Sequence, residues 1–427
     1  MVGREARLSG SFLLYKAHGL DSTWSDAFSD ASDMSRSRAV PHQNTVFRQL
    51  ANRLPWAALE RATAEHRADR GVRKLRTREM LLSLLYAQLA GARSLRDIEA
   101  LLESQPARRY HAGLPLARRS TLSDALAVRP TAVFTAVLAA LIPQLVARKL
   151  RREIDDCVRL IDATPLPLSG LSGEWARFSA QVCGAKAHIV YDPDADCPLY
   201  CSVTPARVND IPAAKEMPIE AGATYVFDLG YYDFGWWARL DEAACRIVTR
   251  LKVNTRLAVI EERPLPLEPG AILSDRIGFL PERQARSRQN PMVQAVREVR
   301  VSTESGTVLR LLTNDLDAPA EEIAALYRRR WAIELFFRWV KQMLRIGHFY
   351  ATSESAVAIQ VTVALIAFVL LKLAHAAQGA VESLTQFARL VGAMLMQQTS
   401  IDSLRGQHAM LLVPPVQLHA QGVLPWA

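Results

Sequence analysis

The sequence predicts an α/β protein with a helical N-terminal part, a β-rich middle and a helical C-terminal part. Apolar residues recur every three to four positions through residues 44–150, which is typical of amphipathic helices. From residue 156 the pattern changes to short β-rich runs separated by turn residues. Helical spacing returns at 319–344 and in an apolar run at 356–377. A further β-rich stretch at about 245–318 lies between strands and helices, which predicts an α/β core interrupted by an insertion.

The chain divides into four segments by pattern and charge. Residues 1–33 carry three cations against five anions, and Met34 opens a basic stretch, Met-Ser-Arg-Ser-Arg. We therefore expect residues 1–41 to be a disordered leader, with translation starting at Met1 or at Met34. Three further segments complete the predicted organisation: a helical domain over 42–150, a larger α/β domain over 151–395 and a C-terminal tail over 396–427.

The helical segment has features of a DNA-binding module. Ser94 and Asp97 form a capping-box pattern ahead of an amphipathic run. The connectors between its short helices are rich in arginine, and such cations can contact a phosphate backbone. They include Arg108, Arg109, Arg118 and Arg119. A plain helical bundle with solvated charges has the same pattern, so both interpretations stay open.

The composition is that of a globular protein with a basic excess. Of 427 residues, 50% are hydrophobic and 22% are charged, and 52 Lys and Arg face 43 Asp and Glu. These values exclude fibrous and disordered classes and are compatible with a polyanionic partner. Five cysteines in so long a chain predict no disulfide framework. Four potential zinc ligands fall within one stretch: Cys183, His188, Cys197 and Cys201. They lack the closely spaced ligand pairs of a zinc site, so free cysteines are favoured.

The apolar run at 356–377 is long enough to span a bilayer. It contains Gln360, Lys372 and His375, and the N-terminus has no secretory signal pattern. A single such run in a basic chain is more typical of a helix buried on all sides. We therefore predict a buried helix and no membrane partner, with a membrane-associated protein as the alternative.

The most informative stretch runs from Tyr327 to Lys341. At about 100° per residue, one helix face presents a tyrosine, three cations and a carboxylate: Tyr327, Arg330, Glu334, Lys341 and, close by, Arg338. Most of the remaining circumference is apolar, which predicts a largely buried helix. A simple i, i+4 ion pair of Arg330 with Glu334 is one interpretation. Cations that hold a phosphate backbone beside a metal-binding carboxylate would explain the whole set.

A carboxylate that binds Mg²⁺ for phosphodiester chemistry needs acidic partners on other elements. Two apolar runs end in an aspartate, Val-Arg-Leu-Ile-Asp at Asp162 and Tyr-Val-Phe-Asp at Asp228. We expect each aspartate to end a strand, and Gly230 to permit a turn close to a ligand. Asp233 is the rival to Asp228, whereas two carboxylates that precede the first strand are expected to be solvated: Asp155 and Asp156.

Two further patterns are better explained by structure than by chemistry. The stretch from Asp192 to Asp196 is similar to a calcium loop but lacks its glycine and its closing glutamate, so a turn between strands is favoured. Trp236 and Trp237 are expected in the core. Trp331, which directly follows Arg330 in sequence, is the better candidate for stacking on a base.

Three motifs in the expected order resemble a known family. The spacing Tyr-x2-Arg-x3-Glu-x6-Lys is similar to the signature of the IS4-type insertion-sequence DDE transposases. The segments IDAT around Asp162 and VFDLGYYDF around Asp228 resemble that family's other two catalytic segments. HQNTVFRQL and STLSDAL resemble the helical domain often placed ahead of this core, so the resemblance covers about 42–395. Leu229 departs from the pattern, where a polar residue is expected.

The resemblance implies an RNase H-like core with a β-rich insertion at about 245–318. It implies a catalytic, metal-binding triad of two aspartates and one glutamate: Asp162, Asp228 and Glu334. This triad would bind two Mg²⁺ ions, for which Mn²⁺ can substitute. Residues of the signature helix would bind the DNA end: Tyr327, Arg330, Lys341, Trp331 and Arg338.

The activity implied is that of a DNA transposase. Metal-assisted hydrolysis at the transposon end would free a 3′-hydroxyl, which would attack the opposite strand to form a hairpin, or attack target DNA. The implied partners are terminal inverted repeats and target DNA, with a homodimer as the active unit of a cytoplasmic, nucleoid-associated prokaryotic enzyme. The alternative is an inactive or domesticated relative that binds DNA without cutting it, and three intact carboxylates argue against it.

Overall fold

A computed structural model gives the structure over residues 44–149, 157–179, 181–265, 270–285, 287–346, 349–378, 383–402 and 404. These residues belong to one compact unit. The predicted leader at 1–41, the second start at Met34 and most of the predicted tail at 396–427 lie outside the described residues.

The N-terminal part is helical, as the spacing of its apolar residues predicts. Helix α4 begins after Ser94, whose Oγ accepts a hydrogen bond from the Asp97 N–H at 3.1 Å, so the predicted cap is present. The helices described before the first strand are α1 (Val46–Ala51), α2 (Trp56–Glu65), α3 (Thr77–Ala90), α4 (Leu95–Glu103), α5 (Pro106–Ala112), α6 (Arg119–Val128) and α7 (Thr131–Lys149).

The middle of the chain forms a large mixed sheet, which confirms the α/β prediction. Its order over the described residues is β3-β2-β1-β4-β5-β11-β10-β7-β6. These strands are β1 (Val158–Leu168), β2 (Cys183–Asp192), β3 (Cys197–Pro205), β4 (Thr224–Phe227), β5 (Arg246–Arg250), β6 (Ala258–Glu262), β7 (Ile272–Phe279), β10 (Val296–Ser302) and β11 (Val308–Thr313). A separate hairpin is formed by β8 (Arg283–Ala285) and β9 (Arg288–Gln289).

The centre of the sheet is parallel and its flanks are antiparallel. Strand β4 pairs in parallel with β1 and β5, and α10 (Phe234–Glu242) crosses from β4 to β5. Beyond β5, the strands β11, β10, β7 and β6 extend the sheet by antiparallel pairs. The β-rich stretch predicted at 245–318 takes in β5, which the structure instead places in the parallel centre. A short apolar run does not reveal in its sequence which strand it pairs with.

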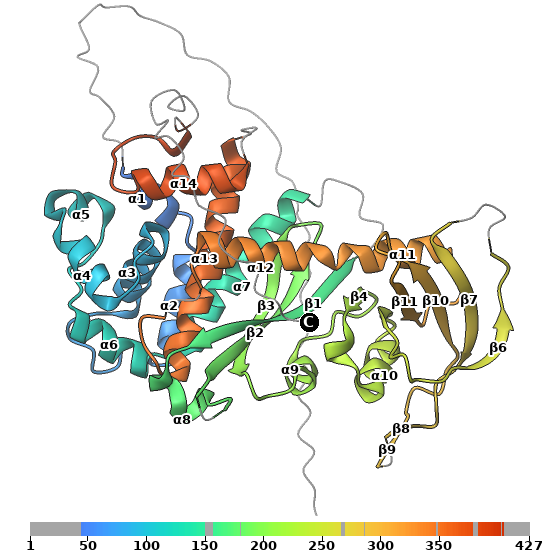
Figure 1. Ribbon diagram of the computed structural model, residues 1–427. Coiled ribbons are helices and arrows are strands. Elements are labelled where there is room, and N and C mark those ends of the chain that lie inside the picture. Colours follow the sequence, from blue (N-terminus) through green and yellow to red (C-terminus); the bar gives the residue numbers. More distant parts are fainter. Residues whose placement is uncertain are drawn as a thin grey trace, which may run out of the picture. The chain divides into compact units, whose positions relative to one another are not determined.

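Helices cover both faces of the sheet (Figure 1). On one face, α11 (Ala320–Arg329) contacts β4, β5, β10 and β11, α12 (Trp331–Met343) contacts β1, and α13 (Glu354–Gln378) contacts β3. On the other face, Trp236 and Trp237 of α10 pack in one cluster with Phe227 and Ile247. The remaining elements are η1 (Gly170–Ser172), α8 (Gly173–Ala176), α9 (Asp210–Glu216), η2 (Leu229–Tyr231) and α14 (Leu384–Met394).

Helix α13 is the predicted apolar helix, and it lies in the core. It contacts α3, α6, α7 and α14 as well as β3, and 89% of its most apolar window is buried inside the protein. By length and composition it could cross a membrane, and among the described residues α6 and α7 meet the same criterion only as a pair bent by 84°. Because α13 packs against both helical and sheet elements, they share one core, and the division into domains at residue 150 stays a prediction.

Candidate active site

Asp162 and Asp228 occupy neighbouring positions on two paired strands. The parallel ladder between β1 and β4 ends with Ile161 beside Phe227. The residue after each of these is an aspartate, Asp162 within β1 and Asp228 directly after β4. The sheet therefore brings together two carboxylates that are 66 residues apart in the sequence.

The sequence predicted that Asp162 ends its strand, and this prediction is wrong. Strand β1 continues to Leu168 and pairs with β2 along this whole stretch. Pro165 and Pro167 suggest a strand end in the sequence, but proline is tolerated where a strand has an open edge. Because β4 ends at Phe227, the side of β1 that faces β4 has no ladder partner beyond Ile161 among the described residues.

Asp228 directly follows β4, as predicted. Its Oδ1 accepts a hydrogen bond from the Gly230 N–H at 2.8 Å. A Cβ at Gly230 would lie 3.0 Å from this Oδ1 and 3.0 Å from Oδ2 of Asp210. Glycine therefore permits the close turn that its place after the aspartate suggested.

Glu334 lies in the first turn of α12, in a segment that was predicted to be one helix from Pro319 to Leu344. The structure instead has two helices, α11 and α12, which meet at Arg330. There the Arg330 N–H donates to the Tyr327 oxygen at 3.1 Å, the i to i−3 pattern of a tighter turn. Arg330 keeps helical angles (φ −53°, ψ −29°), so the predicted face continues across the junction.

Arg330 connects two of the three acidic residues. Its Nη1 donates to Oδ2 of Asp162 at 3.3 Å, and its Nη2 donates to Oε1 of Glu334. The predicted Arg330–Glu334 pair is thus present, but as part of a larger cluster. Among the described residues, no three His, Cys, Asp or Glu side chains lie close enough together to hold a metal as they stand. The cation between Asp162 and Glu334 in this structure is the guanidinium itself.

The surroundings of Asp162 favour a cation. Burial, and then the nearby Asp228 and Glu334 carboxylates, raise the pKa of Asp162 to about 6, although the Ala163 N–H and Arg330 oppose the rise. A raised pKa means that negative charge is unfavourable here without further compensation. Carboxylate oxygens in such a cluster are the ligands that Mg²⁺ and Mn²⁺ prefer. The donor set therefore fits a divalent metal, provided that the guanidinium of Arg330 moves aside.

Tyr327 and Lys341 lie towards the two ends of the predicted helix face. The Tyr327 ring centre is 5.9 Å from Cζ of Arg330. The phenol of Tyr327 is half-buried, and burial raises its pKa. The charge of Asp228 raises this pKa further, so the phenol lies near the second aspartate. Lys341 lines a small cavity with Thr164 of β1, and partial burial lowers the pKa of its amine. Tyr327 therefore lies near the carboxylates, and Lys341 lies beside β1 two residues beyond Asp162.

Helix α12 is more exposed than its sequence predicts. Trp331 is 51% exposed and Leu335 is 46% exposed. Arg338 lies with its Cζ 5.9 Å from the Trp331 ring. Apolar spacing identifies a face that could be buried, but it does not reveal whether another element covers it. A tryptophan, a leucine and an arginine thus form an open surface beside Glu334.

Asp233, the rival to Asp228, is a helix cap. It is 4% exposed, and its Oδ1 accepts a hydrogen bond from the Trp236 N–H at 2.8 Å at the start of α10. Lys215 and Arg288 flank its carboxylate. Trp236 and its neighbour Trp237 are fully buried, as predicted.

The remaining alternatives have structural roles or lie outside the described residues. Oδ1 of Asp192 accepts hydrogen bonds from the N–H groups of Asp194 and Ala195, which forms the predicted turn between β2 and β3. The cysteines of the described residues are free. Two carboxylates fall in the part of the chain that the structure does not describe: Asp155 and Asp156.

Sequence reasoning missed Asp210, a carboxylate near Asp228. Asp210 is the first residue of α9, and its Oδ1 accepts a hydrogen bond from Lys186 Nζ at 2.8 Å. In the sequence, Asn209-Asp210 before a short helix is typical of a cap, so nothing marked it as a neighbour of the site. Its proximity follows from the crossing of α9 over the turn that contains Gly230.

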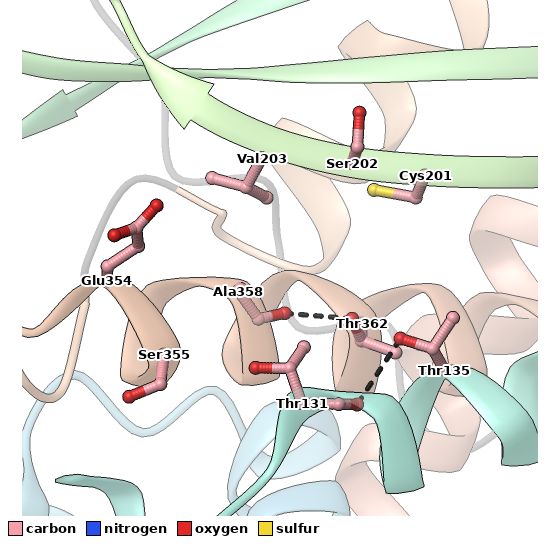
Figure 2. A pocket seen from close by; sticks show the side chains of 9 residues that line it. All are labelled: Thr131, Thr135, Cys201, Ser202, Val203, Glu354, Ser355, Ala358 and Thr362. Carbon is pink, nitrogen blue, oxygen red and sulfur yellow. Dashed lines mark hydrogen bonds between the residues drawn. The ribbon is translucent and has the colours of Figure 1, made fainter. Parts of the chain in front are cut away.

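The cavity drawn in Figure 2 lies elsewhere, between α7, β3 and α13. Its volume is about 530 Å³, and Glu354 is the carboxylate in its lining. The Thr135 and Thr362 hydroxyls donate to backbone oxygens of their own helices, Thr131 and Ala358. This cavity therefore lacks the clustered carboxylates that metal-dependent chemistry needs.

Comparison with known proteins identifies the family. The family described as "Transposase DDE domain" matches residues 153–370, which contain all three acidic residues. The chain belongs to this family. A family described as a domain of unknown function matches residues 42–115, within the helical N-terminal part.

Two relatives agree with this family membership. A protein assigned as transposase y4zB of Sinorhizobium fredii (strain NBRC 101917 / NGR234) is 40% identical over 66% of this chain and 78% of its own length. A protein assigned as the transposase of insertion sequence element IS5377, from Geobacillus stearothermophilus, is 30% identical over 61% of this chain and 68% of its own. The protein is therefore a DNA transposase of an insertion sequence, a metal-dependent enzyme that cleaves DNA and transfers strands.

Among solved structures, one similar chain is the piggyBac transposase in a synaptic complex with hairpin DNA. The match has a TM-score of 0.41 and 11% sequence identity, and it covers 91% of this chain and 88% of the other.

Proposed function

We propose that Asp162, Asp228 and Glu334 form the catalytic metal site of this transposase. The observation that carries this proposal is their convergence: two aspartates follow one strand ladder, and Arg330 connects the first of them to the glutamate. The three carboxylates would hold two Mg²⁺ ions, for which Mn²⁺ can substitute. When bound, the metal supplies charge neutralisation at the scissile phosphate and a more acidic attacking hydroxyl.

The signature helices would bind the DNA end. Arg330 offers a cation beside the carboxylates and Lys341 offers a second one further along α12. A guanidinium can make paired hydrogen bonds to a phosphate. Tyr327, half-buried near Asp228, can donate its hydroxyl to the same backbone. The open surface of Trp331 and Arg338 is suited to stacking on a base.

We also propose that the core is RNase H-like and that it carries an insertion. The support is the strand order β3-β2-β1-β4-β5, with β4 and β5 parallel to β1, while β2 and β3 are antiparallel to their neighbours. The insertion would then comprise β6 to β11, between β5 and α11. The helical part before residue 150 would be the DNA-binding domain, and the IS4-type signature would define the subfamily.

The biological setting follows from the reaction. Joining two transposon ends requires both to be held together, so the active unit is proposed to be a homodimer bound to terminal inverted repeats and target DNA. The enzyme would act in the cytoplasm of a prokaryote, at the nucleoid. The freed 3′-hydroxyl would attack either the opposite strand, which forms a hairpin, or target DNA.

The proposed site is tested by cleavage of end-labelled DNA that carries the terminal repeats flanking the gene, with Mg²⁺ or Mn²⁺ added. We expect Glu334→Gln to lose at least a hundredfold in cleavage, about 2.7 kcal/mol of transition-state stabilisation, while it still binds the DNA. Glu354→Gln, a matched change at the cavity of Figure 2, should cleave like the native protein. Native cleavage by Glu334→Gln would overturn the assignment, and binding without cleavage by the native chain would indicate an inactive relative.

A further inference from the structure

A basic cavity is lined in part by the segment that follows Asp228. It measures about 570 Å³, and its described lining has four cations and no carboxylate. The lining comes from the loop after β5, the hairpin of β8 and β9, and the segment after Asp228. We call this cavity the basic pocket and define it by six of its residues: Tyr232, Lys252, Thr255, Arg256, Arg283 and Arg288.

The loop after β5 is fixed in place by side chains of the sheet. Nη1 of Arg310 donates to the backbone oxygens of Lys252, Val253 and Thr255 at 2.7, 2.9 and 3.0 Å. The Thr255 hydroxyl forms a hydrogen bond with the Tyr232 hydroxyl at 2.6 Å. The ammonium of Lys252 lies 4.3 Å from the centre of the Tyr232 ring. This wall is therefore organised before any ligand arrives, which lowers the entropic cost of binding.

The hairpin wall is tied to the segment that leaves the metal site. Nε2 of Gln284 donates to the Tyr232 oxygen at 2.8 Å, and its Oε1 accepts a hydrogen bond from the Phe234 N–H at 3.0 Å. Arg288 lies 3.5 Å from the Asp233 carboxylate, yet 67% of its side chain stays exposed. The guanidinium can therefore also reach an anion in the cavity.

The basic pocket and the metal site open at the same edge of the sheet. Strands β4 and β5 are parallel neighbours, so Asp228 and Lys252 both follow carboxyl ends of strands. The Thr249 hydroxyl, on β5, donates to the Asp228 oxygen at 3.5 Å. The four residue-to-residue steps from Asp228 to Tyr232 span at most about 14 Å. At about 3.4 Å of rise per nucleotide, this corresponds to roughly four nucleotides of one DNA strand.

We propose that the basic pocket binds the phosphate backbone of the cleaved DNA within roughly four nucleotides of the scissile phosphate. Arg288 is paired with Asp233, but the lining has no carboxylate of its own, so the cavity presents an excess of positive charge that suits a polyanion. Contacts from these cations to phosphates would position the strand without reading its sequence. This inference rests on the proposed metal site, because the site defines which phosphate is cleaved.

The test is the salt dependence of binding to a labelled duplex that carries the terminal repeat, without divalent metal. Each lost phosphate contact lowers the slope of log K against log salt by about 0.9. We expect Lys252→Gln with Arg256→Gln to lower the slope by about 1.8 and to weaken all duplexes alike. Two exposed cations away from the pocket provide the matched control, Arg239→Gln with Arg389→Gln, and should change the slope by less than 0.5. Lys252→Arg with Arg256→Lys should restore the native slope.

A second measurement locates the contact. Neutral methylphosphonates placed singly along the duplex should weaken binding by the native protein at positions within roughly four nucleotides of the cleavage site. Those same substitutions should weaken binding by the Lys252→Gln, Arg256→Gln variant less than binding by the native protein, because two of the four cations are already gone. A native salt-dependence slope in that variant would overturn the proposed role of the pocket. Methylphosphonate losses equal to those of the native protein would also overturn it. Neither result would bear on DNA cleavage by the native protein. Loss of cleavage in the Glu334→Gln variant concerns the metal site alone, so the two failures are distinguishable.

Discussion

Arg330 Nη1 lies 3.3 Å from Oδ2 of Asp162, and the same guanidinium also donates to Glu334. One arginine thus neutralises two carboxylates of the proposed metal site. A metal and this guanidinium cannot both take the same oxygen lone pairs. Metal binding should therefore release Arg330, and the released guanidinium can bind a DNA phosphate. By thermodynamic linkage, DNA that engages Arg330 should in turn strengthen metal binding.

The Arg330→Gln variant tests this coupling. Removal of the competing cation should strengthen Mn²⁺ binding to the free protein by roughly tenfold, in line with about 1.5 kcal/mol for a charge-assisted hydrogen bond. The same change should weaken binding of the terminal-repeat duplex. Calorimetric titration with Mn²⁺ measures the first effect, and Arg338→Gln, on the open side of α12, is the matched control. Weaker Mn²⁺ binding in Arg330→Gln would refute the competition.

Trp331→Ala should weaken binding of the transposon end. A base stacked on an aromatic ring contributes about 1–3 kcal/mol, so we expect roughly a fivefold to hundredfold loss of affinity. Because Trp331 is half exposed, the protein should unfold at the same denaturant concentration as the native chain. Leu335→Ala removes a neighbouring exposed apolar side chain without a ring and should bind like the native protein. Equal losses in the two variants would argue for general apolar contact and against stacking.

Gly230→Ala should impair the metal site without unfolding the protein. Its Cβ would lie 3.0 Å from carboxylate oxygens of both Asp228 and Asp210, so at least one of them must move. We expect weaker Mn²⁺ binding and slower cleavage. Gly170→Ala is the matched control, because a Cβ there meets nothing within 4 Å. Native Mn²⁺ affinity in Gly230→Ala would mean that this turn does not position Asp228.

Acid should destabilise the fold through His188. Burial lowers the pKa of His188 to about 4, with a smaller effect of Lys186 in the same direction and an opposing effect of Asp210. Between pH 6.5 and 4 the unfolded chain binds a proton that the folded chain excludes, so stability falls as the pH falls through this window. The loss from this group is roughly 3 kcal/mol.

Urea unfolding at several pH values measures this effect, and His188→Gln should flatten the profile between pH 6.5 and 4. The buried Nε2 of His188 is 2.8 Å from the Thr204 hydroxyl, a contact that glutamine can keep. In the folded native protein, the NMR signals of the His188 ring should not titrate above pH 5. Titration near 6.5 would contradict the account.

The sequence carried enough information for the α/β class and for choosing the three acidic residues that are proposed as the metal site. Periodicity distinguished helices from strands, and Asp228 follows its strand as the apolar run before it suggests. Periodicity does not reveal which strands pair with one another. It did not reveal that β5 joins the parallel centre, or that β1 continues past Asp162 along an open edge. Both facts depend on which strand lies alongside.

The surroundings of the site were also beyond the sequence. Asp210 reaches the turn after Asp228 through the packing of α9, and its local pattern indicates only a helix cap. The exposure of Trp331 depends on the absence of a covering element over that part of α12 among the described residues. The basic pocket collects cations from loops more than 25 residues apart, so no single window of sequence contains it.

The central claim is that three distant segments share one metal site, and iron-directed backbone cleavage tests it most directly. Fe²⁺ substitutes for Mg²⁺ in an oxygen site, and with ascorbate and peroxide it produces hydroxyl radicals that cut the polypeptide nearby. The account predicts cuts close to Asp162, Asp228 and Glu334 in the same sample, all suppressed by excess Mg²⁺ and by Glu334→Gln. Cuts at one segment only, or at positions away from all three, would contradict it.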